Sequence, residues 1–445
     1  MSSNLISIAA NGVSAAEAGL NITAQNIDNA GTTGYVRRSV QQIELTAPSV
    51  SDAPNVVSVS GVMVTGVTRN TQNYLSNQVN VSAANAARAN GLVTNLTNVE
   101  SAVENSSVYA SIGTFTASLQ TLASNPTSTS QRQTVLADAQ NMAQSFNLAS
   151  TTLASAQQTM QSDATNSVSQ INQLATNLAQ VNQQISANAN PATTGATLLD
   201  QRDALLSQLS SLTDATTTYN TNGTATLTLG GTTGQTLVSG GTANTLSMTT
   251  ATNGTISFSL AGGTITPGGG AIAADQQGLA SAATSATSLD TVANSIVSAV
   301  NTAQSSGTDL TGATGSAIFS GSGAAGISVS MTSASGIATA KAGAAANSTD
   351  ISNLTAMQTA LTTANPAGQT NTLIFNLSSS VQNATTAQTA LTAIAAQAKT
   401  TADTNSGVDL NTEAANLLQY QQAFQASSKV IQTAETIFTQ LLSIN

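Results

Sequence analysis

Apolar residues recur at intervals of seven at both ends of this chain, and this spacing constrains the fold more than any other feature. Near the start the repeat consists of Ile6, Val13, Leu20 and Ile27, with the small residues Ala9 and Ala16 beside it. In the last segment it consists of Leu410, Leu417, Phe424, Ile431 and Phe438, flanked by Leu441. A seven-residue repeat is typical of helices that pack as a coiled coil. We therefore expect helices over residues 3–30 and 407–445 that pair with each other.

Between the ends, the period of the apolar residues changes from helix to strand and back. Residues 40–68 alternate between polar and apolar and are rich in Val, which predicts a β-hairpin. Residues 127–189 contain neither Gly nor Pro and predict one very long helix, with a break near Ser162 left open. The other expected elements are helices from residue 70, at 111–124, 197–212, 277–305 and 350–403, and short strands within 216–270.

The predicted fold class is mainly α with a β-rich insert, in a nested multidomain arrangement. Residues 1–35 with 406–445 would form a terminal coiled-coil assembly domain. Residues 36–215 with 335–405 would form a long-helix bundle domain that includes the hairpin. Residues 216–334 would form a small, β-rich outer domain, because Gly-rich turns separate short alternating segments there.

The composition excludes several kinds of chemistry. The chain of 445 residues has no His and no Cys, which rules out Ser-His-Asp triads, disulfides and the usual zinc sites. Its net charge of −10 and its few, scattered basic residues argue against a nucleic-acid partner. The sequence contains no apolar run of about 20 residues, so it predicts no membrane-spanning helix. We therefore expect no catalytic residue, no metal and no cofactor.

Two pairs of acids deserve weighing as acid–base groups. Asp200 and Asp203 lie three residues apart on one expected helix, with Arg202 between them, so they do not face each other across a cleft. We interpret them as a solvated helix face with local ion pairs. Asp409 and Glu413 lie at the start of the last expected helix, where carboxylates interact favourably with the helix dipole.

Residues 12–38, GVSAAEAGLNITAQNIDNAGTTGYVRR, resemble the N-terminal motif of the rod, hook and hook-associated axial proteins of bacterial flagella. The motif residues that match include Asn26, Asn29, Gly34, Tyr35 and Arg37. The segment LLDQRDALLSQLS at 198–210, together with 299–319 and 406–445, narrows the resemblance to the hook-associated family that forms the first hook–filament junction.

The resemblance implies a structural protein of the flagellum and no enzyme. It implies export through the flagellar type III apparatus without a cleaved signal peptide, and an extracellular location at the hook–filament junction. The terminal helices would be disordered before assembly and ordered by it, with the two heptad rows packed together. The implied partners are further copies in a helical ring, the hook protein below, the second junction protein above, and a cytoplasmic export chaperone at the C-terminal helix.

The chain departs from this family by being shorter than usual, and the shortage lies in the middle, so an outer surface domain is expected to be reduced or missing. Other functions stay open from sequence. One is another axial protein, such as the second junction protein or a flagellin-like protein. A second is a secreted adhesin based on residues 216–270. A third is a hydrolase on an axial scaffold, which would need opposed acids among Asp275, Asp290 and Asp309.

Overall fold

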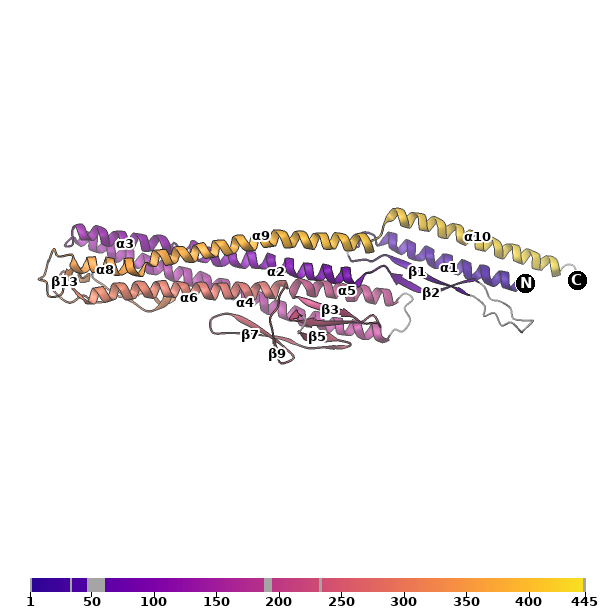
Figure 1. Cartoon of the computed structure of the whole chain (residues 1–445), viewed down its shortest axis with the longest axis horizontal. Coiled ribbons are helices and arrows are strands. Elements are labelled where there is room, and N and C mark those ends of the chain that lie inside the picture. Colours follow the sequence, from indigo (N-terminus) through magenta and orange to yellow (C-terminus); the bar gives the residue numbers. More distant parts are fainter. Residues whose placement is uncertain (1, 33, 46–60, 188–193, 232–233, 443–445) are drawn as a thin grey trace.

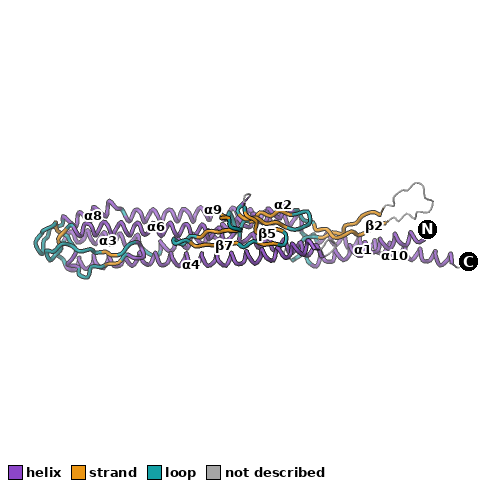
Figure 2. The backbone as a smooth tube through the Cα atoms, turned by 90° about the horizontal axis from the view of Figure 1, so that it is seen from below, coloured by secondary structure: helices purple, strands orange, loops and turns teal. Residues whose placement is uncertain are grey.

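The protein is a long rod with both chain ends at the same extremity (Figure 1). The computed structural model describes residues 2–32, 34–45, 61–187, 194–231 and 234–442. Long helices run along the rod, and small sheets lie against one side of it (Figure 2). The predicted fold class, mainly α with a β-rich insert, is confirmed. We call the terminal helices and the hairpin at residues 38–69 the arm, and residues 73–406 the body.

Long helices form the core of the body. They are α2 (Asn73–Glu104), α3 (Val108–Ser124), α4 (Thr129–Ala187), α5 (Thr194–Leu212), α6 (Gly270–Ser305), α8 (Ser352–Ala364) and α9 (Pro366–Ser406). Helix α2 packs on α6 and α9, whereas α4 packs on α3, α5 and α6. Large apolar side chains such as Phe115, Met142 and Phe146 are fully buried between them. Burial of this kind is the main stabilising contribution to a folded domain.

Helix α4 is continuous through Ser162, where the sequence left a break open. Its buried residues, among them Phe146, Leu153 and Met160, recur every seven residues, so one face stays against the core throughout. The region expected to be helical at 350–403 is instead divided. Asn365 has a left-handed backbone (φ 46°) and accepts a hydrogen bond from the Gly368 N–H, and Pro366 occupies the first turn of α9. This combination ends one helix and starts the next.

The β-rich part packs on the side of the body. One antiparallel sheet has the order β3 (Ala215–Tyr219), β4 (Ala225–Leu229), β5 (Gln235–Ser239) and β6 (Thr242–Ala243). The other has the order β7 (Leu246–Thr250), β8 (Ile256–Leu260) and β9 (Gly263–Ile265). Both contact α4, and their inward residues join the apolar core of the bundle. Helix α6 lies within 216–334, the range predicted as an outer domain, and packs in the bundle on α2 and α4.

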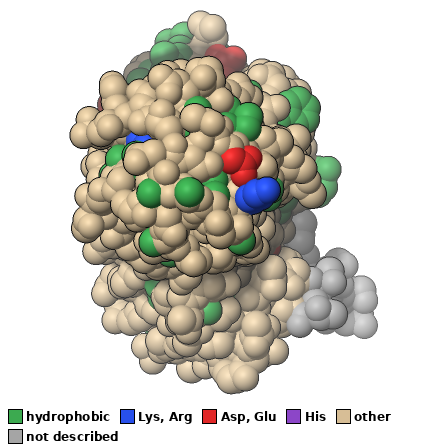
Figure 3. Space-filling model, turned by 90° about the vertical axis from the view of Figure 1, so that its left-hand side faces the viewer, with side chains coloured by type: hydrophobic (Ala, Val, Ile, Leu, Met, Phe, Trp, Pro, Cys, Tyr) green, Lys and Arg blue, Asp and Glu red, His purple; other side chains and the backbone are tan. Residues whose placement is uncertain are grey.

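The body ends in a tip built from short elements. These are β10 (Gly307–Thr308), β11 (Phe319–Ser320), α7 (Gly323–Gly326), β12 (Ser328–Val329), the 3-10 turn at Ala334–Gly336, and β13 (Ala340–Lys341). The fully buried Arg132 of α4 holds this tip by donating to the carbonyls of Pro126 and Ile337, both at 2.6 Å, and to the Thr339 hydroxyl. Burial lowers the pKa of Arg132, and the Asp309 charge opposes that effect. The outer surface of the tip carries few charged groups (Figure 3).

The arm consists of two antiparallel helices and a hairpin. Helix α1 (Ser2–Asp28) runs alongside α10 (Leu410–Leu442), as the matching heptads predicted (Figure 1). Strand β1 (Arg38–Leu45) pairs with β2 (Gly61–Arg69), with an irregularity at Gln41/Gln42, and both strands pack on α1. The hairpin expected at 40–68 is therefore present, although its Val-rich part within 46–60 lies outside the described residues.

Candidate functional site

Small residues form the seam between α1 and α10. An added Cβ at Gly12 would lie 2.7 Å from the Ser427 hydroxyl oxygen, and one at Gly19 would lie 2.5 Å from the Tyr420 ring. One heptad further along, Asn26 donates to Glu413 at 3.1 Å. The two helices therefore approach closely in one antiparallel heptad register. Glycine permits this approach because it has no side chain.

The predicted apolar rows lie beside this seam. On α1, Ile6, Val13, Leu20 and Ile27 are all half-buried. On α10, Leu417 and Ile431 are half-buried, whereas Leu410, Phe424 and Phe438 are 55%, 37% and 50% exposed. Leu441 belongs to α10, but its side chain lies outside the described residues. Within one chain, much of the apolar surface of α10 therefore stays open to solvent.

Helix geometry puts these two rows on the same side of the arm. Each residue of an α-helix turns by roughly 100°, so Val13 and Leu20 lie on one flank of the glycine seam and Ile22 lies on the other. Ile22 is buried, and Ile8 on its flank lies against Gly61 of β2. The free flank of α1 and the Phe424 flank of α10 then form one continuous apolar face. The two heptad rows, which were expected to pack together, lie on this face, whereas the seam itself is marked by the 3–4 spacing of Ala9, Gly12, Ala16, Gly19 and Thr23.

Three of the family-motif residues meet at one buried acid. Glu413, in the first turn of α10, is only 1% exposed and forms a 2.6 Å ion pair with Arg37. Asn26 donates to Glu413, and its own carbonyl oxygen accepts from the Tyr35 hydroxyl at 3.0 Å. Burial is the main cause of the raised pKa of Tyr35. The motif thus joins the first helix to the last, across 376 residues between Arg37 and Glu413.

The other two motif residues shape the turn after α1. Asn29 donates from its side chain to the Gln25 carbonyl at 2.9 Å, which extends the end of the helix. Gly34 is exposed and has a positive φ of 82°, a backbone conformation that glycine adopts readily. These two residues shape the turn after α1, and this turn brings the following segment, with Tyr35 and Arg37, back toward Glu413.

Asp200 and Asp203 take part in a second cluster of ion pairs. Arg38 binds Asp200 at 2.5 Å, and Arg69 binds Asp200 at 2.8 Å and Asp203 at 2.7 Å. Arg202 pairs with Asp203 and stacks on the Tyr219 ring, whose pKa burial raises to about 12. The expected local ion pair between Arg202 and Asp203 is present, but the two acids do not lie on a solvated helix face, because the hairpin arginines partly cover both.

Asp409 and Glu413, which the sequence placed together at a helix start, have different roles. The Asp409 carboxylate accepts from the N–H groups of Asn411 and Thr412, as a helix-capping residue does. Glu413 instead carries the buried ion pair, which the dipole interpretation did not include. No local sequence signal points to it, since its partners come from the other end of the chain.

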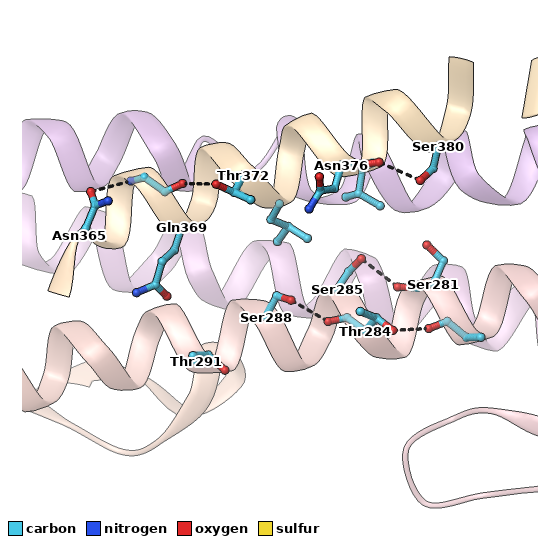
Figure 4. A pocket seen from close by; sticks show the side chains of 14 residues that line it. Ser281, Thr284, Ser285, Ser288, Thr291, Asn365, Gln369, Thr372, Asn376 and Ser380 are labelled. Carbon is cyan, nitrogen blue, oxygen red and sulfur yellow. Dashed lines mark hydrogen bonds between the residues drawn. The ribbon is translucent and has the colours of Figure 1, made fainter. Parts of the chain in front are cut away.

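A groove of 690 Å³ runs between α6 and α9 in the body (Figure 4). Its hydroxyl and amide groups include Ser281, Ser285, Thr372 and Asn376, and none of its 14 lining residues is charged. Several hydroxyls donate to their own helix backbone, as Ser285 does to Ser281. The groove offers hydrogen-bonding groups but no ionisable one.

The three acids that an enzymatic function would need do not face each other. Asp275 and Asp290 lie on α6, fifteen residues and thus roughly 22 Å apart. Asp290 accepts from the Ala324 N–H at 2.6 Å, and Asp309 accepts from the N–H groups of Thr311 and Ala313. Asp290 and Asp309 therefore accept hydrogen bonds from the backbone near them and do not form an opposed acid–base pair with Asp275.

Within the described ranges, no group of three or more acidic, His or Cys side chains could hold a metal ion. In the same part of the chain, no helix is both long and apolar enough to cross a membrane.

The chain is similar to known flagellar proteins. Its relatives include the flagellar hook-associated protein 1 of Salmonella typhimurium, 28% identical over 252 residues, which cover 55% of this chain and 44% of the relative. The protein of that name from Escherichia coli is 24% identical and from Bacillus subtilis 26% identical, with 45% and 43% of their lengths covered. The chain thus matches less than half the length of these relatives.

A solved structure of the flagellar hook junction protein FlgK from Burkholderia pseudomallei is also similar, at 27% identity and a TM-score of 0.49, with 55% of this chain and 46% of that chain covered. The model of the family described as flagellar basal body rod FlgEFG protein C-terminal matches residues 401–444, and that of the flagellar hook-associated protein FlgK helical domain matches residues 93–319. Since the second match covers more than half of the chain, the protein belongs to the flagellar hook-associated protein FlgK family.

Proposed function

We propose that this protein is a structural component of the bacterial flagellum that forms the junction between hook and filament by helical self-assembly through its arm. The observation that carries the proposal is the apolar face shared by α1 and α10, on which Phe424 and Phe438 remain exposed. Exposed apolar surface of this kind marks sites of protein association. The names of the relatives, hook-associated and hook junction proteins, support the same role.

The assembly interface in this proposal consists of the two heptad rows. These are Ile6, Val13, Leu20 and Ile27 on α1, and Leu410, Leu417, Phe424, Ile431, Phe438 and Leu441 on α10. A neighbouring copy that covers this face would bury apolar side chains that one chain leaves exposed. Because the contact joins different faces of successive copies, it propagates as a helix or ring.

The remaining partners follow from this position in the flagellum. The hook protein would lie below and the second junction protein above. A cytoplasmic export chaperone would bind the amphipathic α10 before export, in the manner of a helix in a groove. The protein would be exported without signal-peptide cleavage and would act outside the cell. Its role would be structural, without catalysis, cofactor or metal.

Deletion of the gene tests the proposal. Electron microscopy of the mutant should show hooks without filaments, and a blot should detect flagellin shed into the medium. Reintroduction of the gene should restore filaments. Intact filaments on the deletion strain would overturn the junction role and leave another axial or surface role, such as an adhesin.

A further inference from the structure

Most of the ion pairs of the described residues lie where the arm meets the body. The chain has only nine Lys and Arg residues, and four of them, Arg37, Arg38, Arg69 and Arg202, lie at this point. Of the six ion pairs among the described residues, five are here. We call these arginines, with Asp200, Asp203 and Glu413, the neck. In a protein with 6% charged residues, this concentration calls for a physical reason.

Two adjacent arginines connect the two sides of the neck. Arg37 binds Glu413 on α10, whereas Arg38, the first residue of β1, binds Asp200 on α5. Successive side chains of an extended segment point in opposite directions, which lets neighbouring residues reach the arm and the body at once. On the paired strand β2, Arg69 lies directly opposite Arg38 and binds the same Asp200 and also Asp203.

The body end of the neck is itself anchored. Arg202 donates to the Gly223 carbonyl, in the turn between β3 and β4, and its guanidinium lies 4.7 Å from the centre of the Tyr219 ring. The Arg69 and Arg202 side chains are almost fully buried. Buried ion pairs depend strongly on geometry, because a displaced charge loses its partner without regaining water.

Little apolar packing competes with these ion pairs. Helices α1 and α10 pack principally on each other, and α1 also packs on the hairpin. The main contact between the arm and the body is that of β2 with α5, which is the contact that carries Arg69, Asp200 and Asp203. Two bonds to backbone carbonyls of α9 accompany it, from the Arg37 N–H to Ser406 and from the Asn70 amide to Asn405. The orientation of the arm therefore depends mainly on polar contacts.

We propose that the neck is an ionic lock that holds the arm in one orientation on the body, with Asp200 as its central positioning residue. Asp200 forms ion pairs with an arginine of each strand of the hairpin, so its charge ties both strands to α5. Loss of that charge leaves Arg38 and Arg69 next to a neutral group and frees the arm to pivot. The lock belongs to the single chain and does not rest on the junction role.

Distance measurements between spin labels test the lock. The chain has no Cys, so two introduced cysteines take up all the label. Labels at Ala390 on α9 and Gln425 on α10, both exposed, measure the distance across the neck, between the body and the arm. Labels at the exposed Asn21 on α1 and at Gln425 measure the distance between the two helices of the arm. Pulsed electron paramagnetic resonance of the purified full chain then gives both distance distributions.

Asp200→Asn is the test variant and Asp403→Asn is its matched control. Asp403 also pairs with a cation, Lys399, and lies close to the neck, but that pair is exposed and stays within α9. We expect one narrow peak across the neck in the unmodified chain and in Asp403→Asn, and loss of that peak in Asp200→Asn. The distribution within the arm should stay narrow in all three.

Each other outcome overturns the proposal. A narrow peak across the neck in Asp200→Asn would mean that the backbone contacts suffice. A broad distribution across the neck in the unmodified chain would mean that no single orientation exists to be held. A loss of both peaks in Asp200→Asn would mean that the residue supports the folding of the arm and not its orientation.

Discussion

The body and the arm use helices in opposite ways. In the body, large side chains such as Phe115 and Phe146 are fully buried, and the seams between helices are filled by apolar volume. In the arm, Gly12 and Gly19 make room in the seam for Ser427 and Tyr420, while Phe424 and Phe438 stay exposed. A helix pair with a small-residue seam buries little apolar area by itself. The body therefore has an apolar core of its own, whereas the arm leaves apolar surface exposed, which on our proposal a neighbouring copy covers.

The largest effect should follow from a charge on the open face of the arm. Phe424→Asp places a carboxylate where, on our proposal, a neighbouring copy buries apolar side chains, and an unpaired buried charge is very costly. We expect cells carrying this variant to lose their filaments, as judged by electron microscopy, while the unfolding transition of the body is unchanged. Gln425→Asp, a charge on an exposed neighbouring position, should leave filaments intact. Normal filaments on the Phe424→Asp strain would remove the arm face from the assembly interface.

The body should respond most to a loss of volume. Phe146→Ala leaves a cavity in the core beside α4 and should lower the free energy of unfolding by about 3–5 kcal/mol. Leu148→Ala, two residues further on the same helix, removes a side chain that is 55% exposed and should change it by less than about 0.5 kcal/mol. Urea unfolding followed by circular dichroism measures both. Equal effects of the two substitutions would contradict the core described for the body.

The sequence predicted much of this contrast because periodicity is a local property. The heptads at both ends predicted the paired terminal helices, and the absence of Gly and Pro predicted the length of α4. The alternation in 40–68 predicted the hairpin, apart from the part outside the described residues. What periodicity did not resolve is which of two adjacent rows faces the partner helix, because both rows repeat every seven residues.

The neck could not be predicted from local pattern. Its ion pairs join residues far apart in the chain, such as Arg38 with Asp200 and Arg37 with Glu413. A carboxylate on an amphipathic helix looks solvated in sequence, and only the return of the hairpin onto α5 covers it. The same limit explains α6, whose place in the bundle depends on contacts with α2 and α4 and not on its neighbours in sequence.

A Gly→Ala substitution, which adds one methyl group, should change stability in opposite directions in the body and in the arm. Gly113, in α3, has open space around it, so Gly113→Ala should stabilise the body by about 0.5–1 kcal/mol through helix propensity. Gly19→Ala gains the same propensity but drives a Cβ into the Tyr420 ring, so the arm should be destabilised by about 1–2 kcal/mol. For Gly19→Ala, amide hydrogen exchange should be faster in α1 and α10 than in the parent chain, with unchanged protection in the body. Slower exchange in the arm of Gly19→Ala would contradict the close seam.

Among the residues that the structure describes, each region buries one acid, and the last comparison concerns how these two acids are paired. Glu413 in the arm has a cation beside it, whereas Asp275 in the body, 7% exposed, is hydrogen-bonded only by Asn95 at 3.0 Å, with Asp163 of α4 as the nearby charge. The pKa of Asp275 is raised to about 6, mainly by burial and also by the Asp163 charge, against the lowering by the Asn95 hydrogen bond.

The sign of the resulting pH dependence follows from proton binding. Between about pH 4 and pH 6 the folded chain holds a proton on Asp275 that the unfolded chain has released, so the body should become more stable as the pH falls through this window. Asp275→Asn should remove that dependence and stabilise the body by about 1–2 kcal/mol at pH 7, where the buried carboxylate is charged. Urea unfolding at a series of pH values measures both, with the exposed Asp403→Asn as a control that keeps the slope of the parent chain. If Asp275→Asn keeps that slope too, the carboxylate is better solvated than its burial implies, and the contrast between the paired acid of the arm and the unpaired acid of the body fails.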